Sequence, residues 1–354
     1  MIYLEPLLFA SLTSKNNVDH RISYWNYNKE RELKVELNKL NNFYIPNLGW
    51  FYLDISCLDV TLKYNICFEV FSEMKKVNFK FESPILISEK FELLIHPIDL
   101  LGENFFDEFG KDVPVEITNC AIRFQKYLEK GVRIIEEFNP VWFETLSRHL
   151  KKIVLFEDKS GKRNSFATQS VHGCIFLNCE QDNYNEVFFI EDVAHQSGHV
   201  IFNAFLASDV QIFKVDKDLD IYLDIEKNEF NEPRAIYVVM HAMYTYECII
   251  SCFQKCLENN VFTDHKRHEL IGRLTYTLHK FIRDYKLLTK KNSDGDNLYF
   301  TEYGEEILNW FNETFENCIN EYNNIIKFTD ITNQPYNFSY EEFLKLNPNF
   351  LNEN

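Results

Sequence analysis

The chain has 354 residues, 45% of them hydrophobic, and a formal net charge of −17 at pH 7. The length predicts one large domain or two closely packed ones, because typical domains have ~100–150 residues. The acidity argues against nucleic acid or an anionic membrane as the main partner. It is compatible with a small-molecule or basic peptide substrate, and with a plain contribution to solubility.

The nine cysteines are odd in number and show no disulfide or zinc-knuckle spacing, which favours reduced thiols and a cytoplasmic protein. Cys248, Cys252 and Cys256 recur at helical spacing, as small buried apolar side chains commonly do. Residues 1–10 lack the basic start of a signal peptide. No stretch approaches eighteen uninterrupted apolar residues, so no membrane-spanning helix is expected.

Residues 1–40 are predicted to be mainly helical, because Leu33, Leu37 and Leu40 recur at helical spacing. Short runs rich in aromatic and β-branched residues then predict strands at 50–55, 61–71, 77–81 and 91–96. Residues 50–74 are also compatible with partial helix. The loop-like stretch 102–114 suggests a boundary between an N-terminal mixed α/β region, 1–112, and a second domain, 113–354.

The second domain is predicted to be helical with a small sheet. An amphipathic helix and a shorter one are followed by two apolar strands and a helix that carries His195 and His199. After a polar stretch, Asn231 is a plausible N-cap for a long apolar helix. Further helices complete a C-terminal bundle. Helices are predicted at 116–137, 141–150, 235–257, 264–290, 302–327 and 340–346. Strands are predicted at 152–156, 173–178 and 221–223.

His195 and His199 are four residues apart, so on a helix they share one face and lie about 5–6 Å apart at Cβ. Both imidazoles can then reach one metal ion. In zinc hydrolases with the motif H-E-x-x-H, the glutamate after the first histidine is the general base. Here that residue is Gln196. Ser197 and Gly198 are small and allow a second helix or a substrate to approach.

A third histidine, His241, lies in the long apolar helix, where an unpaired imidazole is costly. Three imidazoles on two packed helices would leave open coordination positions for chemistry. The alternative is that the three histidines are polar groups of a core without metal.

The segments His195-Gln196-Ser197-Gly198-His199, Glu232-Pro233-Arg234 and His241-Ala242-Met243-Tyr244 resemble the HExxH-motif family of peptide-modifying proteins. The resemblance covers about residues 152–258. Members of that family are described as iron(II)- and 2-oxoglutarate-dependent peptide β-hydroxylases. The chain departs from the family at Gln196, which replaces glutamate, and after Arg234, where proline is usual.

The resemblance implies His195, His199 and His241 as iron ligands and an α+β, zincin-like core. A distal carboxylate of 2-oxoglutarate needs a cation, best a guanidinium. Arg234, seven residues before His241 on the expected helix, is the candidate, although pairing with Glu229 or Glu232 is the alternative. Tyr244 is a candidate hydrogen-bond donor to oxygen or the keto acid, or a packing residue.

Gln196 helps to decide between hydrolysis and oxygenation as the reaction. An amide cannot take the proton of metal-bound water, whereas an oxygenase needs no such base. The sequence thus favours an iron(II)/2-oxoglutarate-dependent oxygenase acting on a peptide or protein, which the N-terminal region would recognise. The alternatives are a zinc metallopeptidase with Glu191 or Glu186 as base, and a non-catalytic or degenerate binding protein.

Overall fold

The computed structural model describes residues 5–13, 22, 32–37, 40–64, 67–158, 160–207, 211–221, 234–291, 295 and 297–348. The chain is a mixed α+β protein, as predicted, and forms two compact units. The first comprises Met1–Gln125 with Leu150–Asp182, and the second comprises Lys126–His149 with Asn183–Asn354. This division differs from a boundary at residue 112, because strands β10 (Lys152–Phe156) and β12 (Cys174–Asn178) belong to one sheet with β9 (Phe91–Leu94).

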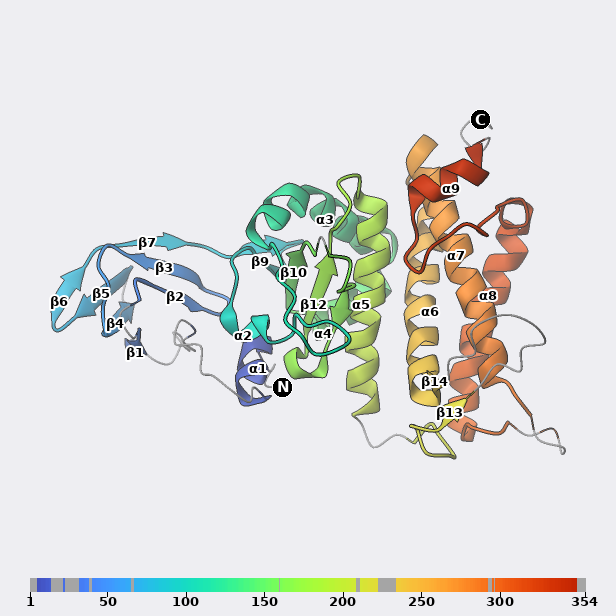
Figure 1. Cartoon of the computed structure of the whole chain (residues 1–354), viewed down its shortest axis with the longest axis horizontal. Helices are drawn as coiled ribbons and strands as arrows, with labels where there is room; N and C mark the ends of the chain where they lie inside the picture. The colour runs from blue at the N-terminus through green and yellow to red at the C-terminus, as the bar shows by residue number, and fades with distance from the viewer. Residues whose placement is uncertain are drawn as a thin grey trace. The chain divides into compact units, whose positions relative to one another are not determined.

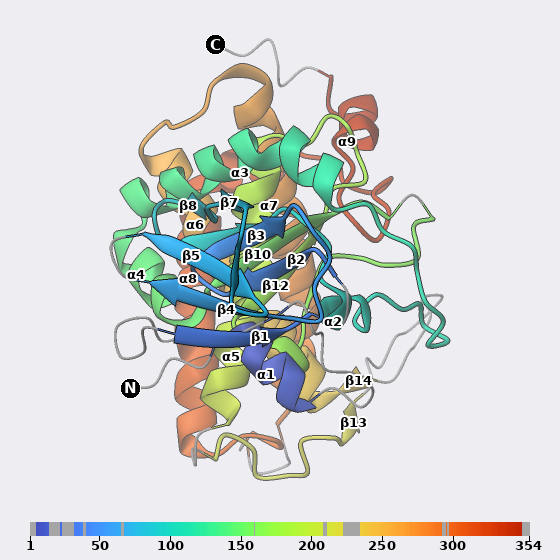
Figure 2. The ribbon, with the colours of Figure 1, turned by 90° about the vertical axis from the view of Figure 1, so that its left-hand side faces the viewer.

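The first unit contains three sheets within its described residues (Figure 1). One is the five-stranded sheet β11-β12-β10-β9-β8, and the others have the orders β1-β4-β5-β6 and β2-β3-β7. Figure 2 shows β1, β4 and β5 side by side. The remaining strands are β1 (Glu32–Glu36), β2 (Asn42–Ile45), β3 (Gly49–Leu53), β4 (Asp59–Tyr64), β5 (Phe68–Ser72), β6 (Lys75–Val77), β7 (Phe79–Glu82), β8 (Ile85–Ile87) and β11 (Phe166–Ala167).

The expectation of helix over most of residues 1–40 is wrong for β1. Helix α1 (Pro6–Thr13) is present, but Glu32–Glu36 pairs antiparallel with β4. Val35 and Leu37 are buried, whereas Lys34 is exposed. Side chains here therefore alternate between the buried and the exposed face with the two-residue period of a strand, and the helical spacing of the leucines does not determine the structure. The run 61–71 is likewise two antiparallel strands, β4 and β5, rather than one.

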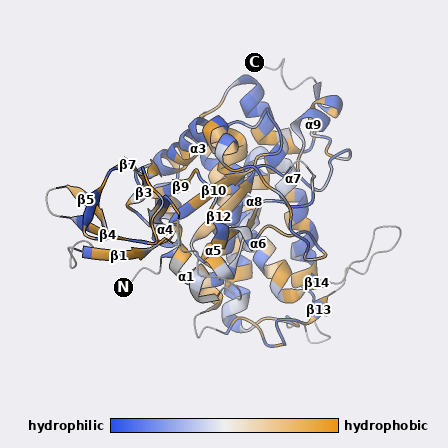
Figure 3. Ribbon diagram, turned by 60° about the vertical axis from the view of Figure 1, so that its left-hand side comes forward, coloured by the Kyte–Doolittle hydropathy of each residue, from blue (hydrophilic) through white to orange (hydrophobic). Residues whose placement is uncertain are grey.

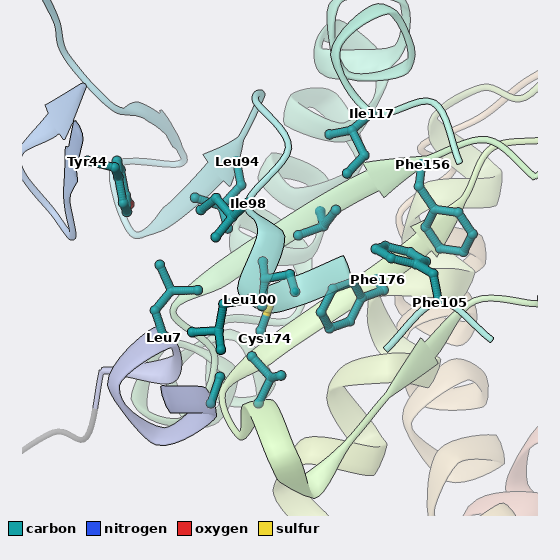
Figure 4. Packing of buried hydrophobic residues seen from close by; sticks show 14 of the residues in the cluster. Leu7, Tyr44, Leu94, Ile98, Leu100, Phe105, Ile117, Phe156, Cys174 and Phe176 are labelled. Atoms are coloured by element: carbon teal, nitrogen blue, oxygen red, sulfur yellow. The ribbon is translucent and has the colours of Figure 1, made fainter. Parts of the chain in front are cut away.

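The five-stranded sheet holds the core of the first unit. All residues of β10 and β12 are buried, as expected for parallel strands covered on both faces, and Figure 3 colours these strands as hydrophobic. Figure 4 shows the aromatic part of this core. There the ring of Phe105 lies 5.0 Å from that of Phe156 and 5.7 Å from that of Phe176, and helix α2 (Asp99–Gly102) is packed beside them.

One charged side chain enters this apolar sheet. Lys152, the first residue of β10, is fully buried, and its Nζ lies 2.5 Å from Glu92 Oε2 and 3.3 Å from Glu5 Oε1. The Tyr44 hydroxyl donates to Glu92 and accepts from Lys152. Burial by itself would lower the pKa of Lys152, but the two carboxylates raise it, so the lysine is a cation at neutral pH.

The second unit is mainly helical, and its predicted helices are confirmed. Asn185 Oδ1 accepts a hydrogen bond from the Val187 amide at 2.8 Å and caps the helix that carries the histidines. The elements are α4 (Pro140–His149), α5 (Glu186–Leu206), β13 (Asp220–Ile221), β14 (Arg234–Ala235), α6 (Ile236–Glu258), α7 (Asp264–Leu288), α8 (Glu302–Ile326) and α9 (Tyr340–Leu346). Helix α3 (Thr118–Phe138), also predicted, contributes residues to both units.

Helix α6 is the central helix of the second unit and contacts α5, α7 and α8. Among the described residues it is the one helix whose length and composition would allow it to cross a membrane. Most of that apolar stretch is buried inside the protein, as in the core helix of a globular unit. All nine cysteines are described and free, and Cys248, Cys252 and Cys256 are buried on α6, as expected.

Candidate functional site

The site is built where α5 and α6 cross closely. A Cβ on Gly198 would lie only 3.2 Å from Thr245 Cα and 3.3 Å from Cys248 Sγ, so the glycine permits this approach. Further along, the Tyr237 hydroxyl donates to Asn203 Oδ1 at 3.2 Å. Residues later in α5 therefore face residues earlier in α6, and the two helices run antiparallel.

This crossing brings the three predicted histidines together. His199 Nδ1 lies 2.9 Å from His241 Nε2, within hydrogen-bonding distance. The ring centroids are 4.4 Å apart for this pair and 4.9 Å apart for His195 and His199. His195 makes no hydrogen bond to another described residue. The imidazoles form a short chain with His199 in the middle.

The histidines lie in a poorly hydrated environment. His241 is only 8% exposed, and the other two are half-buried. Burial lowers the pKa of His195 to about 3 and that of His241 to about 4, and it lowers the pKa of His199 well below 6.5. All three rings are therefore neutral at pH 7, which is the form that binds a metal.

The donor atoms suit a divalent transition metal, but they do not converge on one point. Among the described residues, no group of three His, Cys, Asp or Glu side chains is arranged to hold a metal ion. The 2.9 Å between His199 Nδ1 and His241 Nε2 is a hydrogen-bond length. It is also close to the roughly 3 Å that separates two nitrogens bound at about 2.1 Å and 90° to one ion. A third ligand requires His195 to turn towards this pair.

Gln196 is 2% exposed and points its amide at its own helix. Its Nε2 donates to Asp192 Oδ1 at 3.3 Å, whereas its Oε1 is buried without a partner among the described residues. The Ser197 hydroxyl is also buried without such a partner. Two polar atoms beside the histidines are thus available to a bound group.

Tyr244 is placed next to the site by aromatic packing. Its ring stacks on Phe202 at 5.2 Å, and Phe202 in turn lies 5.0 Å from the ring of His241. The rings of Trp310 and Phe311 of α8 also pack near Tyr244, with centroids 6.2 and 6.3 Å from its ring. The Tyr244 hydroxyl makes no hydrogen bond to a described residue, so packing is the role that the structure shows for this residue.

Arg234 differs from its expected position. It lies in β14 rather than on helix α6, and its Nη1 binds both carboxylate oxygens of Asp284, at 3.0 and 2.9 Å. Asp284 is fully buried on α7 and also accepts from Arg283 Nε at 2.9 Å. The partner of Arg234 is thus a residue 50 positions later in the chain. Asn231, Glu229, Glu232 and Pro233 lie outside the described residues.

Sequence reasoning missed the contribution of α7. Glu191, one turn before His195, is paired with Arg273 at 2.5 Å. Lys280, also on α7, lies close enough to His195 for its charge to lower the pKa of that ring, although burial of the ring is the larger cause. No motif marks these residues, because they reach the site only through the packing of α7 against α5.

Comparison with known proteins leaves the site to be interpreted from its own chemistry. No protein-family model matches the chain, and no curated protein is significantly similar to it.

Replacing Gly198 by alanine tests whether the helix crossing sets the histidine geometry. Alanine favours the helix by up to about 1 kcal/mol, but the new methyl would contact the Thr245 backbone, which cannot move aside cheaply. Overpacking of this kind costs ~1–3 kcal/mol, so we expect a net loss of about 1 kcal/mol in a urea titration. The matched variant Gly102→Ala, where a Cβ meets nothing within 4 Å, should not show this loss. Equal stability of the two variants would contradict the close crossing.

Proposed function

We propose that the chain is an iron(II)- and 2-oxoglutarate-dependent oxygenase that hydroxylates a peptide side chain at its β-carbon. The observation that carries the proposal is the meeting of His195, His199 and His241 on α5 and α6. Neutral imidazoles are good ligands for iron(II). When bound, the iron and the keto acid would supply the activation of oxygen. The role of the chain is to hold and orient both and to exclude water.

The side chains around the histidines support an oxygenase over a peptidase. A peptidase needs a carboxylate to accept the proton of an attacking water. Gln196 cannot do so. The two other glutamates considered for this role are engaged in ion pairs: Glu191 with Arg273, and Glu186, fully buried, with Lys130 and Lys266. The donation from Gln196 to Asp192 is compatible with a second-sphere role for the amide.

A peptide substrate is supported by the sheets of the first unit. Within the described residues, β1 and β6 are the edges of the four-stranded sheet, and β7 is one edge of the three-stranded sheet, whose other edge strand, β2, already bridges to Ile22. Exposed edges can bind an extended peptide as an additional strand. The proposal includes a zincin-like arrangement of the catalytic core. It also includes a cytoplasmic location, which the nine free thiols support.

The first test measures iron directly. The full chain, reconstituted with iron(II) under argon and desalted, should retain about one equivalent by elemental analysis. His199→Ala and His241→Ala should each weaken iron binding at least ~100-fold, since even second-sphere partners of metal ligands contribute 10–100-fold. His265→Ala, an exposed histidine on α7, is the control. Retention of less than about a tenth of an equivalent by the wild type would favour histidines that serve only as hydrogen-bonded core groups.

The second test measures turnover. Iron-loaded protein should convert 2-oxoglutarate to succinate slowly on its own and faster with a substrate peptide, whose mass rises by one oxygen atom. A library of synthetic peptides provides the substrates. Succinate formation should be lost in His241→Ala and kept in His265→Ala. Peptide cleavage in place of oxygen addition would favour the peptidase.

A further inference from the structure

Two arginines lie beyond the carboxyl ends of the parallel strands β10 and β12, and they differ in their partners. Arg123 of α3 donates to Glu157 Oε2 at 3.1 Å and to Asp182 Oδ1 at 2.8 Å, so both of its terminal nitrogens bind carboxylates. Among the described residues, Arg163 has no ion-pair partner and no side-chain hydrogen bond, and its Nε is buried. The carboxyl ends of parallel strands are a common position for ligands.

The backbone of Arg163 is fixed by residues at the ends of β10 and β12. Its amide donates to Asp158 Oδ2 at 2.8 Å, and its carbonyl accepts from Asn178 Nδ2 at 2.9 Å. Asn178 is the last residue of β12, and Asp158 follows β10 by two residues. The loop between them turns at Gly161, whose φ of 65° favours glycine. The Arg163 side chain therefore extends from a well-anchored part of the loop.

Two phenylalanine rings flank the guanidinium. Arg163 Cζ lies 3.9 Å from the ring centre of Phe166 on β11 and 4.8 Å from that of Phe106. The N–H donors of a guanidinium lie in its plane, so a contact between its face and a ring leaves them for other partners. Phe106 is 40% exposed, and Phe109, three residues later, is 85% exposed. The unpaired cation thus adjoins an apolar ring that solvent reaches.

The acidic side chains of the two adjacent loops are occupied by backbone amides. Asp158 is 1% exposed and accepts from three amides within residues 160–163. Asp107 accepts from two amides of its own turn, at 3.0 and 2.9 Å. Neither carboxylate forms an ion pair with Arg163. Burial lowers the pKa of Arg163, with no carboxylate to offset that effect. An anion at the guanidinium would therefore be stabilised.

We propose that Arg163, together with Phe106 and Phe166, forms a binding site for a ligand that carries an oxyanion on a flat apolar group. A guanidinium binds a carboxylate or a phosphate through two parallel hydrogen bonds. The exposed face of the aromatic surface would contact the apolar part of the ligand. The site lies entirely in the first unit and uses none of the histidines, so it does not depend on the oxygenase proposal.

The test measures affinities by ligand-observed NMR with the full chain in the presence of EDTA, so that no metal contributes. The probes are benzoate and phenyl phosphate, with benzamide as the uncharged counterpart and acetate as the anion without a ring. At least one of the aromatic anions should bind with a dissociation constant below about 5 mM. Benzamide and acetate should bind at least ~fivefold more weakly. The tighter of the two aromatic anions identifies the preferred oxyanion.

Variants of the two arginines locate the binding. Arg163→Met should weaken the tighter anion at least ~tenfold, because it removes both the charge and the donors. Arg163→Lys keeps the charge without the planar fork and should give an intermediate loss. Arg123→Met, which removes a guanidinium already paired with two carboxylates, is the matched control and should change the affinity less than ~threefold. Phe106→Leu should weaken benzoate roughly two- to fivefold.

Unchanged affinity in Arg163→Met would overturn the site. So would an equal loss in Arg123→Met, which would indicate a general effect of net charge. Benzamide that binds as tightly as benzoate would show that the rings alone hold the ligand, and acetate that binds as tightly would contradict the apolar part of the proposal. Absence of binding by both aromatic anions would also overturn the site. Iron binding at the histidines is measured separately, so the failure of this inference and that of the proposed function are distinguishable.

Discussion

Replacing Lys152 by methionine should lower the free energy of unfolding of the first unit by about 3 kcal/mol at pH 7. Removing one partner of a buried ion pair leaves the other charge unpaired in a poorly polarisable surrounding, which costs ~3–5 kcal/mol. Lys152 is fully buried, and Glu92 is 3% exposed. Burial raises the pKa of Glu5, so this carboxylate takes up a proton more readily and relieves some of that cost, which places the expected loss at the lower end.

Hydrogen exchange of peptides from β10 measures the effect where it arises. Lys90→Met, an exposed lysine just before β9, is the control and should change the free energy of opening by less than about 0.5 kcal/mol. The double variant Lys152→Met with Glu92→Gln should recover part of the loss, because one of the unpaired carboxylates is then neutral. A loss in Lys152→Met no larger than in Lys90→Met would show that the network is not formed.

The long periodic elements of this chain were predictable from sequence. Helices α3, α6, α7 and α8 have the length and the apolar spacing that determine a helix locally, and the apolar strands β10 and β12 have the run length of buried strands. The first forty residues were harder to predict. Leu33 and Leu37 fit a helix, but with Val35 they also fit the alternation of a strand, and pairing with β4 decides between them.

The candidate site was predictable to the extent that its residues are close in sequence or share a helical face. His195 and His199 are fixed by their spacing, and the small Gly198 indicates the close approach of α6. The cations could not be placed in this way. Whether Arg234 binds a ligand or Asp284 depends on the packing of α7, which no local pattern encodes. The same holds for Lys280, whose charge acts on the His195 ring from a helix 85 positions later in the chain.

A buried carboxyl group in the second unit should make the stability of the protein depend strongly on pH. Glu247 of α6 is 4% exposed, and its Oε2 has no partner among the described residues. Burial raises its pKa from 4.5 to about 8, against a smaller opposing effect of a hydrogen bond with Thr314 on α8. The folded protein thus holds a proton on Glu247 at neutral pH, whereas the unfolded chain does not.

The sign of the pH dependence follows from this difference in protonation. Between about pH 4.5 and pH 8 the folded state binds more protons at Glu247 than the unfolded state, so its contribution to stability falls as the pH rises. The slope approaches 1.4 kcal/mol per pH unit, which amounts to roughly 2 kcal/mol between pH 5 and pH 7. This is opposite to the behaviour of carboxylates whose pKa is lowered by ion pairs.

Glu247→Gln keeps the shape of the side chain and removes its titration. In urea titrations at pH 5, 6, 7 and 8, the variant should gain stability relative to the wild type as the pH rises, by roughly 2 kcal/mol between pH 5 and pH 7. Glu258→Gln, at the exposed end of the same helix beside Lys255, should follow the wild-type profile. Parallel profiles for Glu247→Gln and the wild type would show that Glu247 is ionised inside the folded unit. Since α6 also carries His241, a stability gain without loss of iron binding would further show that this carboxyl group is separate from the histidine site.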